Sequence, residues 1–222
     1  MEKQRTAIVN LKNYKESTGK NIENFLGSLN SVHTDEKVRI IMAINPIDLK
    51  SAKKYSKFEV FSQTVDPVPK GSFTGKIPME SLSEIGVNGS LINHSENRIE
   101  PQKIESIIQM SRTYSLETVL CVESPEEASR YASLKPNFMA YEPPSLIGGN
   151  ISVTTAEPSI ISDVVSVCRT HGVKVLVGAG VKTGEDARRS VELGAEGVLI
   201  ASGIVKSDEP SNALEAIIHG LI

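Results

Sequence analysis

The chain has 222 residues and a formal net charge of −3, and its charges are spread along the sequence without a basic block. This distribution argues against nucleic acid or an anionic membrane as the main partner. The length suffices for one large domain or two small ones. No run approaches the roughly 20 apolar residues of a membrane span, and the polar start at residues 1–5 is unlike a signal peptide, so we expect a cytoplasmic protein.

Eight short apolar runs recur along the chain, and each is followed by a helical pattern. We predict strands at residues 6–10, 38–44, 59–63, 89–93, 117–122, 137–141, 174–177 and 197–201. The helices that follow are predicted at 19–29, 46–55, 78–85, 101–113, from 125 onward, at 158–171, from 184 to a stop at 194, and at 210–219.

Capping residues mark the start of several of these helices. Ser124 precedes Pro125 and two glutamates, which supplies a cap, a first-turn proline and acids near the positive end of the helix dipole.

Cys121 lies in the apolar run at 117–122, and Cys168 in a helical pattern, so we expect both thiols to be reduced and buried.

The predicted strands are rich in Val, Ile and Leu and show little alternation, which is typical of strands covered on both faces. Eight strand–helix units without a break in composition predict a single (β/α)8 barrel over residues 1–222. A doubly wound sheet has the same alternation and is the alternative fold.

Polar and small residues fall at or just past the carboxyl ends of the predicted strands, which is where a barrel of this kind builds its active site. These residues are Asn10, Lys12, Gln63, His94, Glu142, Gly178–Ala179–Gly180 and Ala201–Ser202.

Glu142 is the best candidate for a catalytic base. Pro143 biases it towards an extended backbone, and Pro144 keeps the following segment out of a helix. Gly148 and Gly149 follow further along, so the loop has a restricted backbone at its start and a flexible one at its end. A fixed carboxylate with such a loop behind it suits a base that works under a closing lid, whereas an exposed glutamate before a turn is the alternative.

Three further side chains are candidates for substrate contact. Asn10 and Lys12 stand at alternate positions and point the same way, so Lys12 could place a cation beside a substrate anion; an ordinary solvated lysine is the alternative. His94 precedes a predicted short helical turn at 95–96, whose N-terminus would keep the imidazole neutral and able to donate to a carbonyl oxygen. A core histidine that is bonded to backbone is the alternative there.

The loop around Gly178–Gly184 lacks the glycine spacing of a dinucleotide fingerprint. We expect instead that Gly180 and Ala201–Ser202 offer backbone N–H groups to a phosphate, although glycines that serve only tight turns would look the same. No Cys/His spacing predicts a metal, and no lysine stands alone in an apolar strand as a Schiff-base nucleophile would.

Six motifs in register resemble the triosephosphate isomerase family, and in particular its short archaeal branch. They are Asn10-x-Lys12, Gly71-x-x-Thr74-Gly75, Asn93-His94-Ser95-Glu96, Tyr141-Glu142-Pro143-Pro144-x-Leu146-Ile147-Gly148, Gly178-Ala179-Gly180 and Ala201-Ser202-Gly203.

The resemblance implies a TIM barrel that interconverts dihydroxyacetone phosphate and D-glyceraldehyde 3-phosphate in glycolysis and gluconeogenesis, without a cofactor. It implies that Glu142 is the base, that His94 polarises the carbonyl, that Lys12 stabilises negative charge and that Asn10 orients the substrate; this mechanism is carried over from the family. The implied substrate-binding residues are Asn10, Leu11, Lys12, Ile147, Gly148, Gly180, Ala201 and Ser202.

The resemblance also implies self-association as a dimer or tetramer. The Gly71–Gly75 loop would insert beside a neighbouring active site and bring Thr74 near that neighbour's Asn10; a solvent-exposed hairpin tip is the alternative, but it would leave Phe73 exposed.

Two departures from the family pattern stand out. The lid ends Gly148-Gly149-Asn150 instead of Gly-Thr-Gly, which affects its hinge, and Asn97 replaces an arginine, which would remove an ion pair. Two other functions fit the residues: another phosphate-binding barrel such as a phosphosugar epimerase or aldolase, and a barrel that only binds a sugar phosphate.

Overall fold

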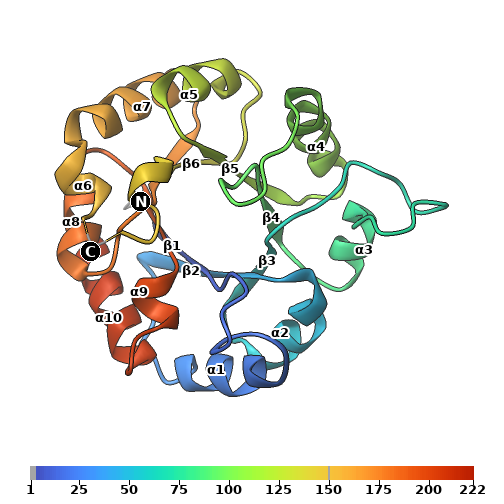
Figure 1. Ribbon diagram of the computed structural model, residues 1–222, viewed down its shortest axis with the longest axis horizontal. Coiled ribbons are helices and arrows are strands. Elements are labelled where there is room, and N and C mark those ends of the chain that lie inside the picture. Colours follow the sequence, from blue (N-terminus) through green and yellow to red (C-terminus); the bar gives the residue numbers. More distant parts are fainter. Residues whose placement is uncertain (1–3, 150) are drawn as a thin grey trace.

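In the computed structural model, which describes residues 4–149 and 151–222, the apolar runs form parallel strands that close into an eight-stranded barrel in sequence order (Figure 1). The strands are β1 (Arg5–Asn10), β2 (Val38–Ile44), β3 (Glu59–Ser62), β4 (Gly89–Ile92), β5 (Glu117–Val122), β6 (Phe138–Tyr141), β7 (Lys174–Val177) and β8 (Gly197–Ile200). Because β1 pairs with β8, the predicted barrel is confirmed and the doubly wound alternative is excluded.

Helices surround the barrel and cover its outer face (Figure 1). They are α1 (Ile22–Leu29), α2 (Leu49–Tyr55), α3 (Met79–Glu84), α4 (Pro101–Thr113), α5 (Pro125–Ala132), α6 (Val153–Ala156), α7 (Pro158–Thr170), α8 (Gly184–Glu192), α9 (Ser202–Val205) and α10 (Pro210–Leu221). Short 3-10 turns occupy Gly19–Asn21, Pro46–Asp48 and Pro144–Leu146. The expected cap of α5 is present, since the Ser124 hydroxyl accepts the Glu127 N–H.

Two short helices, α6 and α9, were not predicted. Each has four residues, which is too short to produce a helical repeat of apolar positions. Helix α9 follows the end of β8 closely, whereas α6 follows the segment after Glu142.

The core has two layers separated by the barrel wall. Side chains inside the barrel come from alternate strand positions, and they include Phe61, Phe138 and Ala140. The positions between them, such as Tyr141, face the helices and belong to a larger cluster between the barrel and its helical shell. Side chains alternate along a strand, and Tyr141 faces the helices. The next residue, Glu142, therefore faces the barrel axis.

The amino ends of the strands are tied together by Arg39. Its guanidinium donates to both carboxylate oxygens of Glu59 and of Glu117, at distances of 2.5 to 2.9 Å. The hydrogen bond from Glu59 raises the pKa of Arg39 against the opposing effect of burial, so the cation is fixed between two acids on β3 and β5. This network lies at the end of the barrel opposite to the candidate site.

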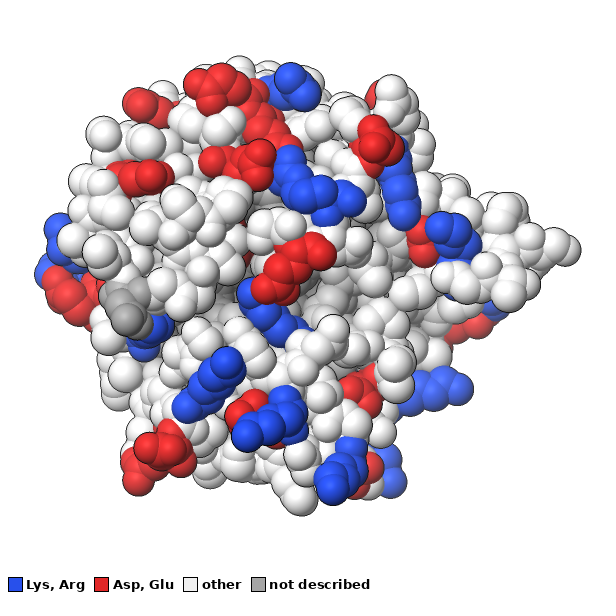
Figure 2. Space-filling model, in the orientation of Figure 1, with Lys and Arg blue, Asp and Glu red and all other residues white. Residues whose placement is uncertain are grey.

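Acidic and basic side chains are interspersed over the face shown in Figure 2, and one of each sign stands near its middle. No helix formed by residues 4–149 and 151–222 is long and apolar enough to cross a membrane.

Candidate active site

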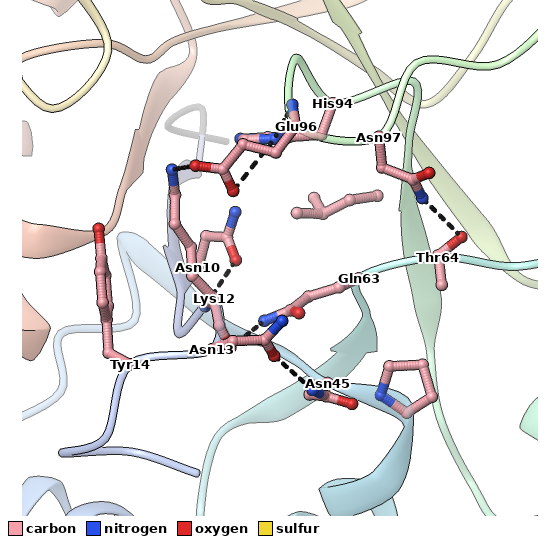
Figure 3. Close-up of a pocket in the computed structure, with 12 residues that line it drawn as sticks. Asn10, Lys12, Asn13, Tyr14, Asn45, Gln63, Thr64, His94, Glu96 and Asn97 are labelled. Atoms are coloured by element: carbon pink, nitrogen blue, oxygen red, sulfur yellow. Dashed lines mark hydrogen bonds and ion pairs between the residues drawn. The ribbon is translucent and has the colours of Figure 1, made fainter.

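The carboxyl ends of the strands surround a cavity of about 500 Å³ (Figure 3). The predicted residues Asn10, Lys12, Gln63 and His94 line it, although they come from loops far apart in the sequence. A narrower recess of about 30 Å³ adjoins it, because Asn10 and Lys12 line both spaces. The structure thus brings together residues that the sequence analysis could only assign to the same rim.

Lys12 is held in an unusual backbone conformation that directs its side chain along the rim. Its φ of 46° lies in the left-handed region, and the Asn10 Oδ1 accepts its N–H at 3.0 Å. The Gln63 amide donates to its carbonyl at 3.1 Å, so the backbone is fixed on both sides. The ammonium Nζ pairs with the Glu96 carboxylate at 2.6 Å, and Figure 3 shows this contact at the edge of the cavity. Lys12 is therefore not an ordinary solvated lysine.

His94 presents one nitrogen to the cavity and uses the other to bond the backbone. Its Nδ1 accepts the N–H of Glu96 at 3.1 Å, so Nδ1 carries no proton and the neutral ring has its single proton on Nε2. The expected helical turn at 95–96 is a hydrogen-bonded turn instead, in which the Asn97 N–H bonds to the His94 carbonyl at 2.8 Å. The backbone hydrogen bond from Glu96 fixes the orientation of the His94 ring.

Glu142 lies opposite His94, with 3.7 Å between Glu142 Oε2 and His94 Nε2. The residue is 7% exposed, and Oε2 finds no hydrogen-bond partner among the described residues. The Cys121 thiol lies behind this carboxylate; burial and then the nearby Glu142 charge raise the pKa of Cys121 well above its ordinary value. A buried carboxylate oxygen without a partner is costly, and it is free to accept a proton from a bound molecule.

The narrower recess collects the residues that were expected to hold a phosphate. Ile147 and Gly148 line it from one side, and Gly180, Ala201 and Ser202 from the other. Ser202 is the first residue of α9, which gives the loop after β8 the short additional helix that commonly accompanies phosphate sites in this fold. Leu11 lines neither space, because its side chain is buried in the outer core cluster.

Two glycines in the loop after β7 are required by close packing. A Cβ on Gly178 would lie 2.4 Å from the Glu142 Cγ. Gly180 has a φ of 72°, and a Cβ there would lie 2.2 Å from the Ile151 carbonyl oxygen. These glycines do more than allow a turn, since they let the loop approach Glu142 and the segment after the lid.

The segment after Glu142 begins with a 3-10 turn at Pro144–Leu146 and continues through Gly148, whose φ is 71°. Leu146 and Ile147 are partly buried against the outer core cluster. Asn150, the last residue of the hinge departure, lies outside the described residues.

The larger cavity has a polar wall to which the sequence analysis gave no function. Asn13, Asn45 and Thr64 line it, and Asn97 donates to the Thr64 hydroxyl at 3.4 Å (Figure 3). The sequence analysis expected that Asn97, which replaces an arginine of the family, would remove an ion pair. In its place Asn97 makes this weak hydrogen bond. The role of Glu96 as partner of both Lys12 and His94 was also missed, although its position two residues after His94 was a usable signal.

Comparison with known proteins gives a consistent result. A family model described as triosephosphate isomerase matches residues 5–220. The chain is 50% identical to a triosephosphate isomerase of Thermoplasma volcanium over 96% of this chain and 99% of the relative. It is 39% identical to one from Archaeoglobus fulgidus, over 98% and 99% of the two chains, and 37% identical to one from Methanothermus fervidus, over 95% and 96%.

Proposed function

Because the chain belongs to the triosephosphate isomerase family, and so interconverts dihydroxyacetone phosphate and D-glyceraldehyde 3-phosphate, we propose that this reaction takes place in the two adjoining recesses at the carboxyl end of the barrel. Family membership sets aside the epimerase, aldolase and binding-only alternatives. The observation that carries the proposal is the buried Glu142 Oε2, which has no hydrogen-bond partner among the described residues and lies 3.7 Å from His94 Nε2.

Glu142 is the base in this proposal. Its carboxylate removes a proton from the carbon next to the substrate carbonyl and returns a proton to the neighbouring carbon, which converts ketose to aldose or the reverse. Two features support the role: the carboxylate is shielded from water, and Gly178 leaves room for it to face the barrel axis.

His94 and Lys12 stabilise the oxyanion that forms when the carbon loses its proton. The Nε2–H of His94 donates to the carbonyl oxygen, and this hydrogen bond strengthens as negative charge develops there. The Lys12 ammonium adds a fixed positive charge, while Asn10 holds the Lys12 backbone in place. Without substrate, Glu96 neutralises this ammonium at 2.6 Å, so a dianionic substrate competes with Glu96 for Lys12.

The phosphate binds in the narrower recess, against backbone N–H groups of Gly148, Gly180 and Ser202. Holding the phosphate away from the base fixes which carbons lie beside Glu142, so binding at one end of the substrate supplies orientation at the other. The segment from Pro143 to Gly149 acts as a lid in this proposal. It keeps water out and prevents the enediolate from expelling its phosphate.

An assay that couples glyceraldehyde 3-phosphate formation to its oxidation tests these roles. Glu142→Asp retracts the carboxylate by one methylene, so turnover is expected to fall by roughly 10²-fold or more with little change in KM. Glu105→Asp is the matched control, because it makes the same change on the exposed face of α4. Unchanged turnover in Glu142→Asp would rule out Glu142 as the base.

We also propose that the protein associates with itself, at least as a dimer, through the projecting loop between β3 and α3 (Figure 1). Residues 69–76 of this loop are exposed, and Phe73 is 42% exposed near its tip. The larger cavity is an acceptor of suitable size for the tip of a neighbour's loop, and Ile47 beside it is 87% exposed. Burying Phe73 against such a surface would remove apolar area from water, and would bring Thr74 towards the neighbour's Asn10.

The base of this loop is closed by Asp66, which supports a preformed shape. Its Oδ2 accepts the Ile77 N–H at 3.0 Å, and its Oδ1 accepts from the Lys103 ammonium at 2.7 Å. A loop that is already ordered loses less entropy when it docks.

Sedimentation velocity over a range of protein concentrations tests the interface. Phe73→Glu is expected to shift the protein to monomers and to lower activity, because the neighbour's loop no longer lines the site. Ile222→Glu is the control, since it places the same charge at another exposed apolar residue, which is 57% exposed. Self-association that survives Phe73→Glu would place the interface elsewhere.

We further propose that residues 1–222 form one domain and act in the cytoplasm. The pairing of β1 with β8 supports the first point, because it joins the two ends of the chain in one barrel. Both substrates are charged intermediates of glycolysis and gluconeogenesis, which supports the second. Cell fractionation should recover the activity together with a cytoplasmic marker, and recovery with membranes would contradict this location.

A further inference from the structure

A partly buried hydrogen bond joins the strand before the lid segment to the helices that follow it. Tyr141 is the last residue of β6 and directly precedes Glu142, and its side chain is 2% exposed in the layer between barrel and helices. Its hydroxyl donates to the Glu157 Oε2 at 2.6 Å. Glu157 is the single residue between α6 and α7, so this bond connects the residue before the base to the point where the chain leaves the lid region.

Each partner is itself fixed to the scaffold. The Tyr141 carbonyl accepts the Gly178 N–H at 2.9 Å, and the Glu142 N–H donates to the Val122 carbonyl at 2.9 Å, so the end of β6 is held by both neighbouring strands. On the other side, the Glu157 N–H donates to the Val153 carbonyl at 2.9 Å.

The helix between them is anchored to the phosphate side of the site. The Val153 N–H donates to the Ala179 carbonyl at 3.2 Å, in the loop that follows β7. The Ser152 hydroxyl caps α6 and bonds the buried Thr154 hydroxyl at 2.8 Å. Residues 143–149 therefore lie between two elements that are fixed by hydrogen bonds, β6 and α6. The Tyr141 hydroxyl connects β6 to Glu157, the residue after α6.

The chemistry of this bond makes it one of the stronger kinds. Burial first, and then the Glu157 carboxylate, raise the pKa of Tyr141 well above its ordinary value, so the phenol stays protonated and donates to an anion. Hydrogen bonds to an ionised acceptor are roughly twice as strong as those between neutral groups.

We propose that Tyr141 and Glu157 are positioning residues for the isomerase reaction, whose hydrogen bond fixes the junction of α6 and α7, which follow the lid, relative to the carboxylate of Glu142. The inference rests on the proposed roles of Glu142 and of the lid. Neither residue touches the substrate. Their bond keeps the end of β6 and the end of α6 at a constant separation, so the lid that lies between these two elements closes over the recess in one register and excludes water from the enediolate.

Loss of the bond should show in the fate of the intermediate. When the lid fits loosely, the enediolate phosphate can break its C3–O bond, and the electron pair leaves with inorganic phosphate. The remaining enol tautomerises to methylglyoxal: it gains a proton at C3 and loses one from its hydroxyl. This elimination needs no oxidant or co-reactant. A merely structural role would lower the melting temperature without changing the ratio of methylglyoxal to glyceraldehyde 3-phosphate.

The test compares Tyr141→Phe, Glu157→Ala and Glu157→Gln in single-turnover and steady-state assays that measure both products. Tyr141→Phe and Glu157→Ala are expected to lower kcat about tenfold and to raise the fraction of methylglyoxal, because a lid displaced by a fraction of an ångström no longer seals the site. Glu157→Gln keeps an acceptor oxygen and should fall between them and the wild type. The double variant Tyr141→Phe with Glu157→Ala should be no worse than either single variant, because both remove the same bond.

Tyr131→Phe is the control, because it removes the phenol hydroxyl of another buried tyrosine, on α5, and leaves the lid unaltered. Wild-type kcat and product ratio in Tyr141→Phe would overturn the proposal, as would an equal change in Tyr131→Phe. Should Tyr141→Phe fail to fold, the two changes at half-buried Glu157 decide the question. Glu142→Asp in the same assay separates this proposal from the proposed role of Glu142. If the turnover of Glu142→Asp is unchanged, the assignment of Glu142 as the base fails. If that turnover falls while the variants at Tyr141 and Glu157 behave as wild type, only the positioning role of the Tyr141–Glu157 hydrogen bond fails.

Discussion

Replacing Gly178 by alanine should damage catalysis without damaging the fold. The added Cβ would lie 2.4 Å from the Glu142 Cγ and 2.7 Å from its Oε1, whereas ordinary contact begins near 3.4 Å, so the shortfall is about 1 Å. The backbone cannot easily withdraw, because the Gly178 N–H is bonded to the Tyr141 carbonyl at 2.9 Å. The Glu142 side chain must therefore move by about 1 Å, away from the geometry in which it faces His94.

A displacement of about 1 Å at a reacting group can cost roughly 10²-fold in rate, which corresponds to about 2.7 kcal/mol in the activation free energy. We expect kcat of Gly178→Ala to fall by about this factor. KM should change little, because the change leaves the residues of the narrower recess in place. Gly178 is not in the left-handed region, so alanine strains no backbone and the melting temperature should remain close to that of the wild type.

The coupled assay gives kcat and KM, and thermal unfolding followed by circular dichroism gives stability. Gly27→Ala is the control. It lies inside α1, where the added Cβ would meet nothing within 4 Å beyond its neighbours in the helix, and it should leave kcat unchanged while it stabilises the helix by about 0.5–1 kcal/mol. In the double variant with Glu142→Ala, the Cγ that the added Cβ would meet is absent, so the two losses should not add. A Gly178→Ala enzyme within twofold of the wild-type kcat would refute the reasoning.

Three other changes test separate parts of the molecule. Lys12→Ala should raise KM and lower kcat together, because it removes positive charge that both substrate and oxyanion require; steady-state kinetics in which only one constant changes would contradict this. Arg39→Met should lower the free energy of unfolding by roughly 1–2 kcal/mol, since it leaves two partly exposed acids uncompensated at the amino ends of β3 and β5, while kcat at 25 °C should be retained. Burial opposes ionisation of Asp66, but hydrogen bonds from the Lys103 ammonium and the Ile77 N–H hold its pKa below the ordinary 3.8. Because the folded pKa is the lower one, the stability that ionised Asp66 contributes is complete above pH 3.8 and is lost as the pH falls further; chemical unfolding should therefore show that Asp66→Asn is less stable than the wild type at neutral pH and that the gap narrows in acid.

Much of the fold could be predicted because it depends on patterns that are local in the chain. The run at residues 38–44 has the length and apolar continuity of a strand covered on both faces, and β2 has the same bounds. The cap at Ser124 was visible because its hydroxyl and the Glu127 N–H that donates to it lie within a few residues of each other. The candidate base and electrophile were also visible, since Glu142 and His94 each follow a predicted strand directly.

The tertiary structure alone decided how these groups meet. Lys12 and Glu96 are 84 residues apart, and their ion pair exists because closure of the barrel brings β1 and β4 to one rim. The same holds for the close approach of Gly178 to Glu142 and for the bond between Tyr141 and Glu157, which depend on where neighbouring strands and a four-residue helix come to rest. Spacing along a strand determines the side to which a residue points, but the distance to its partner is set by packing between elements that are remote in sequence.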